Sequence, residues 1–266
     1  KSLGGDVESP IRDKSELEII GCADAIMVSC TEEQAQFQSL YGSAPGAIEV
    51  LAPGVERAFF SPGDRRGARH ALGLGTGPML LFVGRIQPLK GLDIAVRTLA
   101  ELGRNDARLI VVGGASGVEG ALELARVEAL IQELGLVGRV KFYEPQPHHL
   151  LSTFYRAADV VLVPSRSESF GLVALEAAAC GIPVVATAVG GLMNLIEDGK
   201  TGFLVPGRDV AGFARFTRRL LDDSLLAISM GTAAAHRAQS YSWKSAALKA
   251  RSVYTELLER DLVACS

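Results

Sequence analysis

Several features that mark other classes of protein are scarce or missing in this 266-residue sequence. It contains four cysteines and no Cys-x-x-Cys pair, which indicates neither a zinc knuckle nor a disulfide framework, so we expect reduced thiols. The net charge of −3 lacks the basic excess of a nucleic-acid-binding surface. The longest apolar stretch, 171–193, is a poor membrane span because Glu176, Pro183 and several glycines interrupt it. We therefore expect a cytoplasmic protein without a membrane span or nucleic-acid partner.

Two other kinds of site are not indicated either. His148 and His149 have no further ligands at metal spacing, so we expect them to be structural or at the surface and expect no metal site. No Ser-His-Asp or Cys-His arrangement can be assembled, and nothing indicates a protein nucleophile. Arg215, Arg218 and Arg219 are typical of a solvated helix edge.

Short β-branched runs alternate with helical patterns, which is typical of a parallel sheet covered by helices on both faces. The expected strands are 25–29, 48–51, 79–83, 109–112, 140–143, 160–164, 183–186 and 203–205. The expected helices lie near 13–22, 31–41, 64–72, 91–102, 119–134, 148–157, 171–180, 191–197, 209–222, 224–239 and 243–260. The sequence therefore predicts an α/β fold with a doubly wound parallel sheet, in which ligands bind at the carboxyl ends of the strands.

The best domain boundary lies around 52–64, where Pro53-Gly54 and 61–64 punctuate a segment with little periodic structure. The segment before it is too short for a core of its own, whereas six strand–helix units follow it. The predicted segments are 1–52, a hinge at 53–64, a complete ligand-binding domain at 65–240 and a C-terminal helix at 241–266. The chain also begins at Lys1 rather than Met, so we expect that the start of a longer protein is missing.

The first loop with chemical character, 83–91, follows an apolar strand and precedes an amphipathic helix. On it lie Arg85, whose guanidinium can grip phosphate oxygens in a fork, and Lys90, whose ammonium supplies a point charge. A solvated loop with two cations is the alternative. The loop is not a Walker A motif, because no glycine precedes Lys90 and Gly91, rather than Ser or Thr, follows it.

The second loop, 112–117, is rich in glycine, ends a strand and opens a helix. Gly113 and Gly114 would let backbone amides approach a ligand closely. Ala115 stands where the fingerprint G-x-G-x-x-G has its second glycine, so the loop is weak evidence for a nicotinamide cofactor. A tight turn without a ligand is an equally good interpretation.

The third loop, 165–170, is followed by a helix that begins at Gly171. Glu168 lies on the loop and Glu176 lies in the helix. The free amides of Phe170, Gly171 and Leu172 would point outward at a positive dipole end, where an anion or a hydroxyl can bind. Glu176 lies in an otherwise apolar run, where an unpaired carboxylate is costly. Either a partner inside the protein or a bound polar ligand, such as a ribose diol, must compensate it. Glu168, on the loop, can meet another part of the same ligand.

The pattern Gly84-Arg85-x4-Lys90-Gly91 followed by Glu168-Ser-Phe-Gly-x4-Glu176 resembles the retaining glycosyltransferases of family 4, the group 1 glycosyl transferases. The resemblance covers nearly the whole chain and is strongest to their D-inositol 3-phosphate glycosyltransferase and sucrose-phosphate synthase members. It implies a GT-B fold, with two facing Rossmann-like domains. This chain would then be the C-terminal, donor-binding half, with 1–52 as a remnant of the acceptor domain.

Carried over by position, the resemblance assigns a role to each motif. Arg85 and Lys90 would hold the donor diphosphate, Glu168 would lie beside the transferred sugar, and Glu176 would bind the ribose. These implied catalytic residues are Arg85, Lys90 and Glu168. The full donor-binding set implied is Gly84, Arg85, Lys90, Gly113, Gly114, Gln146, Glu168, Ser169, Phe170, Gly171, Leu172 and Glu176.

The reaction implied is transfer of a hexose, GlcNAc or glucose, from a nucleotide diphosphate sugar, by default UDP-linked, with retention and without a covalent protein intermediate. No cofactor or metal is implied. A sugar or inositol-type acceptor would bind mainly to the absent N-terminal domain, so we expect this chain to bind donor without completing transfer. Association into a homo-oligomer is compatible with the sequence.

Two other functions share the fold or the ligand. A non-hydrolysing UDP-sugar epimerase has the same architecture, so the fold cannot decide between the two enzymes. An epimerase would interconvert nucleotide sugars with no acceptor present. A nucleotide-sugar binding module without transferase activity is the second alternative, and the reading frame upstream of this chain distinguishes it.

Overall fold

The structure is a computed structural model that describes residues 10–259. Residues 1–9, the first part of the predicted acceptor-domain remnant, and residues 260–266, which include Cys265, lie outside the described residues. In chain order the elements are α1 Pro10–Cys22, β1 Ala25–Val28, α2 Thr31–Tyr41, β2 Ala47–Val50, α3 Arg65–Ala71, β3 Met79–Val83, η1 Pro88–Lys90, α4 Leu92–Glu101, β4 Arg108–Val112, α5 Gly120–Glu133, β5 Val140–Tyr143, α6 His148–Ala157, β6 Val160–Val163, α7 Leu172–Ala179, β7 Val184–Thr187, α8 Gly191–Leu195, β8 Phe203–Val205, α9 Val210–Asp222, α10 Ser224–Ala238 and α11 Trp243–Leu258. Every expected strand is present, with its ends within one residue of the prediction.

Strands β3 to β8 form one six-stranded sheet in the order β5-β4-β3-β6-β7-β8, and every neighbouring pair is parallel. The chain enters at β3, winds outward to β5, and then crosses back so that β6 pairs with β3, with Leu80 opposite Val160. This order is that of a Rossmann fold, so the predicted α/β, doubly wound parallel sheet is confirmed. The winding reverses between β3 and β6, and a crevice forms at such a switch point.

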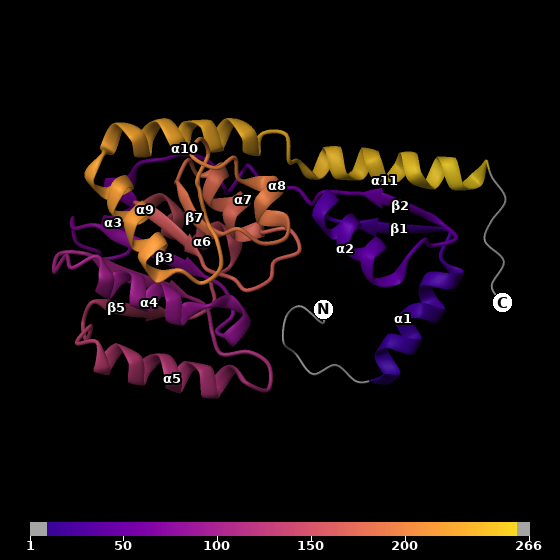
Figure 1. Ribbon diagram of the computed structural model, residues 1–266. Helices are drawn as coiled ribbons and strands as arrows, with labels where there is room; N and C mark the ends of the chain where they lie inside the picture. Colours follow the sequence, from indigo (N-terminus) through magenta and orange to yellow (C-terminus); the bar gives the residue numbers. More distant parts are fainter. Residues whose placement is uncertain (1–9, 260–266) are drawn as a thin grey trace.

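Successive side chains of each strand enter two different cores, one on each face of the sheet. In β3, Leu81 packs with α3, α6 and α7, whereas Leu80 and Phe82 pack with α4, α5 and α9. Figure 1 shows helices layered on both sides of the sheet. Because both faces are covered, the central strands are apolar at every position, and each fully buried leucine contributes about 1.5–3 kcal/mol.

Strands β1 and β2 form a separate parallel pair beside the six-stranded sheet. Helix α11 lies across this pair (Figure 1) and is held there by the ion pair of Lys249 Nζ with Glu49 Oε2, at 2.6 Å, and by the buried side chains of Ala246 and Val253. We call residues 10–50 the N-terminal unit. The two sheets are thus distinct. The predicted division of the chain into segments 1–52, 53–64, 65–240 and 241–266 stays a prediction.

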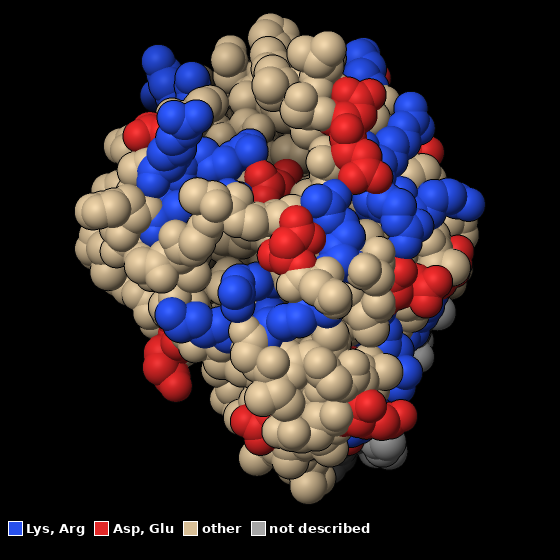
Figure 2. Space-filling view, turned by 90° about the vertical axis from the view of Figure 1, so that its left-hand side faces the viewer, with Lys and Arg blue, Asp and Glu red and all other residues tan. Residues whose placement is uncertain are grey.

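The end of the molecule remote from the N-terminal unit carries charges of both signs. Figure 2 shows lysine and arginine interspersed with aspartate and glutamate over this face. Ion pairs account for part of such mixing. Arg65 and Arg69 both bind Asp159, at 2.7 and 2.6 Å, and Arg104 binds Asp222 at 2.8 Å. This face therefore lacks the single-sign field that a nucleic-acid surface needs.

The cysteines differ from the sequence expectation at one position. Cys30 and Cys180 are free and buried, but Cys22 is disulfide-bonded, so the expectation of reduced thiols is wrong for Cys22. Disulfide formation depends on the approach of two Cβ atoms in the fold, which sequence spacing does not give. None of the helices described combines the length and apolar character of a membrane span.

Candidate functional site

The loops that follow β3 and β6 meet at the switch point. The Arg166 amide donates to the Leu89 carbonyl at 2.8 Å, which ties the two loops together. A Cβ on Gly91, whose φ is 71°, would lie 2.2 Å from the Pro164 carbonyl oxygen, so no larger residue fits there. Glycine at position 91 therefore allows the loop after β3, with Arg85 and Lys90, to lie directly against the loop after β6, with Glu168.

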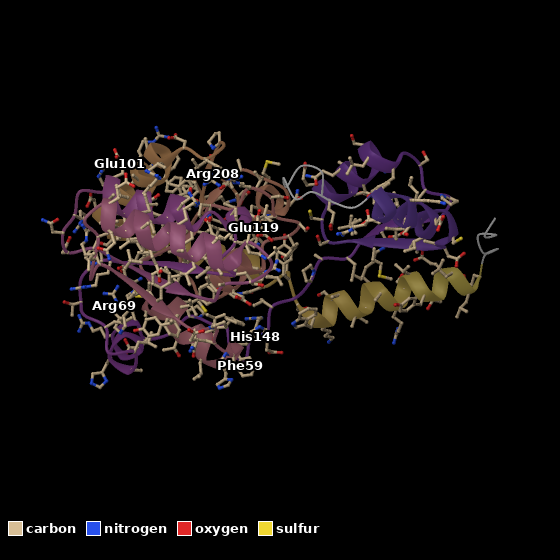
Figure 3. The ribbon with its side chains drawn as sticks, turned by 90° about the horizontal axis from the view of Figure 1, so that it is seen from below. Phe59, Arg69, Glu101, Glu119, His148 and Arg208 are labelled. Carbon is tan, nitrogen blue, oxygen red and sulfur yellow. The ribbon has the colours of Figure 1, made fainter. Side chains whose placement is uncertain are left out.

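The carboxyl edge of the sheet faces the N-terminal unit. In Figure 3, Glu119 and His148, which follow β4 and β5, lie toward that unit, whereas Arg69 and Glu101, which precede β3 and β4, lie at the opposite end. The side chains predicted to bind a ligand come from loops on the carboxyl edge. These loops therefore lie at the end of the sheet that faces the N-terminal unit.

A cleft of about 400 Å³ opens at this edge between the ends of β3, β4 and β5. Five of the predicted site residues line it, namely Gly84, Arg85, Gly113, Gly114 and Gln146. Pro145 and Leu151 add apolar surface, which suits a flat ring, and Gln146 is kept in the wall by donating to the Glu144 carbonyl at 2.9 Å. The structure thus brings the first two predicted loops and the Gln146 loop together around one cavity.

The walls of the cleft depend on close contact between two glycines. The Gly84 amide donates to the Val112 carbonyl at 3.0 Å, and a Cβ on Gly113 would lie 1.9 Å from the Gly84 carbonyl oxygen. Gln87 Nε2 also donates to the Ser116 carbonyl at 3.0 Å. The glycine-rich turn is therefore packed against the Arg85 loop, and together they form one wall of the cleft.

Lys90 and Glu168 form an ion pair with each other. Lys90 Nζ lies 2.7 Å from Glu168 Oε2, and both side chains are about four-fifths buried, at 21% and 18% exposure. Ser165 Oγ also donates to Glu168 Oε2, at 3.3 Å. Arg85, by contrast, is exposed and has no ion-pair partner among the described residues. The site thus holds one uncompensated cation and one cation balanced by the neighbouring carboxylate.

The start of α7 offers backbone donors. Gly171 has a φ of 103°, and the amides of Phe170, Gly171 and Leu172 have no acceptor among the described residues. The Phe170 side chain is buried and meets the Tyr241 ring edge-on at 5.7 Å. Phe170 can therefore contact a ligand only through its backbone, whereas the Leu172 side chain is exposed.

Glu176 has a partner inside the protein. The buried Tyr155 hydroxyl donates to Glu176 Oε2 at 2.7 Å. Burial raises the pKa of Glu176 above its ordinary value, and the Tyr155 hydrogen bond partly opposes that rise. Tyr155 lies one helical turn after Leu151, which lines the cleft. Glu176 itself is not among the residues that line the cleft.

Sequence reasoning missed Tyr155 as this partner. The available signal is a tyrosine at helical spacing from Leu151 on an otherwise apolar helix face, because a buried tyrosine hydroxyl usually has a hydrogen-bond partner. Which acceptor it meets depends on how α6 packs against α7. The internal partner and the ligand interpretation of Glu176 are compatible, since Tyr155 engages one carboxylate oxygen and leaves the other.

Other sequence features lie apart from the cleft. His148 and His149 approach the rings of Phe60 and Phe59 at 5.8 and 6.2 Å, and no cluster with metal-ligand geometry occurs among the described residues. A more open groove of about 790 Å³ lies between α10 and the turn before β8 and contains none of the predicted site residues. We therefore place the candidate site at the smaller cleft.

The comparison with known families decides the classification. The model of "Glycosyl transferases group 1" matches residues 64–237. The chain belongs to this family. The match runs from the start of α3 to the end of α10 and so includes all three loops of the candidate site.

Relatives with names agree with the family. The chain is 46% identical over 262 residues to a D-inositol 3-phosphate glycosyltransferase of Acidothermus cellulolyticus, covering 96% of this chain and 58% of that protein. It is 47% identical over 247 residues to the protein of the same name from Mycobacterium bovis, covering 91% of this chain and 50% of the other. The chain thus spans about half to three-fifths of the length of these curated relatives.

Two solved structures share the fold. Sucrose-phosphate synthase from Thermosynechococcus elongatus superposes with a TM-score of 0.88 at 34% identity, covering 97% of this chain and 66% of that one. The Anabaena protein Alr3699/HepE in complex with UDP-glucose superposes with a TM-score of 0.83 at 25% identity, covering 94% and 70%. The predicted GT-B type of fold is therefore confirmed for the part of these chains that is matched.

Proposed function

We propose that this chain is the donor-binding half of a retaining glycosyltransferase that takes a hexose from a UDP-linked donor. The observation that carries the proposal is a cleft suited to a flat ring and lined by Arg85, with the Lys90–Glu168 ion pair on the loops after β3 and β6. Glu176, which keeps one carboxylate oxygen beyond its Tyr155 bond, supplies the second carboxylate in the proposal. A nucleotide diphosphate sugar would match these groups, with the base in the cleft, the ribose diol at Glu176, the diphosphate at the two cations and the sugar beside Glu168. The UDP-glucose complex of the Anabaena relative supports the same ligand class.

Each group then has one task. The base enters the cleft beside Gln146, and the free oxygen of Glu176 accepts hydrogen bonds from the ribose. Arg85 and Lys90 hold the diphosphate, while the amides of Phe170, Gly171 and Leu172 lie near the sugar and phosphate. Fixed positive charges and oriented amides stabilise the negative charge that develops on the departing diphosphate, and such preorganised groups supply most of the catalysis in sites without a nucleophile.

For the complete protein, we propose that the departing diphosphate takes up the acceptor proton on the face where the acceptor attacks. The acceptor is a hydroxyl, of the sugar or inositol type that the names of the relatives suggest, and it binds mainly to residues beyond this chain. The cytoplasmic location and any homo-oligomer likewise stay predictions.

A donor panel tests the proposal. Calorimetry on the 266-residue chain should show binding of UDP-glucose or UDP-GlcNAc and weaker binding of the GDP- and ADP-linked hexoses. With the full-length enzyme, the product should keep the anomeric configuration of the donor. Absence of binding by every nucleotide sugar would contradict the donor site, an inverted product would contradict the mechanism, and interconversion of donors without acceptor would indicate the epimerase.

A further inference from the structure

The segment Glu168–Leu172 is anchored through its carbonyl oxygens on two sides. The Glu168 carbonyl accepts the Gly191 amide at 2.9 Å. The Ser169 carbonyl faces the N-terminal unit, where Ser29 Oγ lies at 3.3 Å and Cys30 Sγ at 3.2 Å. Residues that are about 140 positions away in the sequence therefore contact the centre of the glutamate motif.

Of Ser29 and Cys30, only one can donate a hydrogen bond to the Ser169 carbonyl. A serine hydroxyl has a single hydrogen, and that of Ser29 is directed at Glu33 Oε2, which is much nearer at 2.5 Å. Glu33 Oε2 also accepts the Ser29 amide at 2.6 Å, which fixes that arrangement. The Cys30 thiol has no competing acceptor among the described residues, so it is the donor to the Ser169 carbonyl.

The thiol is itself held in place by α2. Cys30 is the N-cap of this helix, with extended backbone, and its sulfur accepts the Glu33 amide at 3.4 Å. The side chain is buried, at 5% exposure. Serine, threonine, asparagine and aspartate are the usual caps, so a cysteine that both caps the helix and donates to another loop combines two roles at this position.

Peptide geometry links this contact to the ligand. The Ser169 carbonyl and the Phe170 amide belong to one planar trans peptide group, in which C=O and N–H point in opposite directions. A donor on the carbonyl therefore fixes the direction of the Phe170 amide, which has no acceptor in the described structure. The Gly191 contact fixes the preceding peptide group in the same way.

We infer that Cys30 is a positioning residue for the donor site, acting on the Phe170 amide through the Ser169 carbonyl. The inference rests on the proposed function, because it assigns a task to an amide that would lie near the sugar and phosphate. It also means that the N-terminal unit contributes to donor affinity without touching the donor. Uridine would reach only the base cleft and Glu176, so its affinity should not depend on the contact between Cys30 and the Ser169 carbonyl.

The test compares two ligands on the 266-residue chain. Cys30→Ala should weaken UDP-hexose binding roughly three- to tenfold, the equivalent of one hydrogen bond, while uridine affinity stays unchanged. Cys30→Ser, which keeps a donor, should bind the UDP-hexose within about twofold of the wild type. Lys249→Ala is the matched control, because it removes a different contact of the N-terminal unit and should leave both affinities unchanged.

The outcomes distinguish a failure of the Cys30 role from a failure of the proposed function. Unchanged UDP-hexose binding by Cys30→Ala, or an equal loss for uridine, would overturn the role of Cys30. Wild-type protein that binds uridine but no UDP-hexose would overturn the proposed function itself. If Cys30→Ala does not fold, Cys30→Gly serves instead, since glycine is tolerated at an N-cap and also lacks the donor.

Discussion

The Glu176 carboxylate has one hydrogen bond from Tyr155 and limited contact with water, so its ionised form is costly. For an acid with a raised folded-state pKa, the stabilising contribution is fully present below the unfolded-state pKa and is lost as the pH rises through the folded-state pKa. Above the folded-state pKa the ionised Glu176 carboxylate is therefore destabilising, and a ligand that donates hydrogen bonds to it would compensate this cost. Such a trade of stability for binding is common at functional sites.

Replacement of Glu176 by glutamine separates stability from binding. Glu176→Gln retains an acceptor for Tyr155 but carries no charge, so its free energy of unfolding should exceed that of the wild type at about pH 8. The difference should narrow as the pH is lowered towards about 4. Donor affinity should fall about tenfold or more, because hydrogen bonds to a charged acceptor are lost. Urea unfolding at several pH values and calorimetry with UDP-glucose measure the two effects, and a less stable variant at pH 8 would contradict the account.

The Lys90–Glu168 pair predicts opposite effects for its two members. Lys90→Ala should reduce UDP affinity at least tenfold, since it removes a charge that binds the diphosphate. Glu168→Gln should raise UDP affinity about two- to fivefold, because it releases Lys90 and removes a repelling carboxylate, and partly exposed pairs have small energies. Lys200→Ala, remote from the cleft, is the control. Tighter UDP binding by Lys90→Ala, or weaker binding by Glu168→Gln, would show that this pair does not border the diphosphate.

At the scale of elements, the cleft exists because the turns after β3 and β4 touch through glycine. Gly113→Ala would bring its Cβ 1.9 Å from the Gly84 carbonyl and force the turns apart. We expect a loss of about 1–3 kcal/mol in the free energy of unfolding, as for other overpacked positions, and weaker nucleotide binding. Gly75→Ala, where nothing lies within 4 Å, is the matched control and should change neither quantity. Wild-type behaviour of Gly113→Ala would mean that the turns are not held together.

At the scale of the whole molecule, α11 joins the two sheets. The chain after β2 runs beside the linker that precedes α11, with the Val55 amide donating to the Tyr241 carbonyl at 3.2 Å. A Cβ on Gly54 would lie 2.1 Å from the Trp243 nitrogen. The N-terminal unit is therefore connected to the six-stranded sheet by the linker before α11 and by the contacts of α2 with α8 and with the glutamate motif.

Truncation after Ser242 tests this arrangement. The six-stranded sheet, with cores on both faces, should stay folded and bind uridine, while the amides of β1 and β2 lose protection in hydrogen exchange because Ala246 and Val253 no longer cover them. Retained protection of β1 and β2 in the truncated chain would show that α11 is not what stabilises this pair.

The sequence by itself determined the type and order of the elements, the parallel α/β class and the loops that follow the strands at the candidate site. It could do so because β-branched runs, helical spacing and glycine-rich strand ends are local properties of the chain. The motif with Arg85, Lys90, Glu168 and Glu176 was sufficient to predict the family. The short helix η1 was not predicted, since three residues around Pro88 give too little periodicity.

Only the tertiary structure decided how these groups are compensated. Tyr155 meets Glu176, Lys90 meets Glu168, and Cys30 meets the Ser169 carbonyl across separations of 21, 78 and 139 positions. The disulfide bond of Cys22 likewise depends on the tertiary structure. Such pairs depend on the packing of whole helices and loops, because a hydrogen bond requires placement within a few tenths of an ångström, and no local pattern specifies distances of that kind.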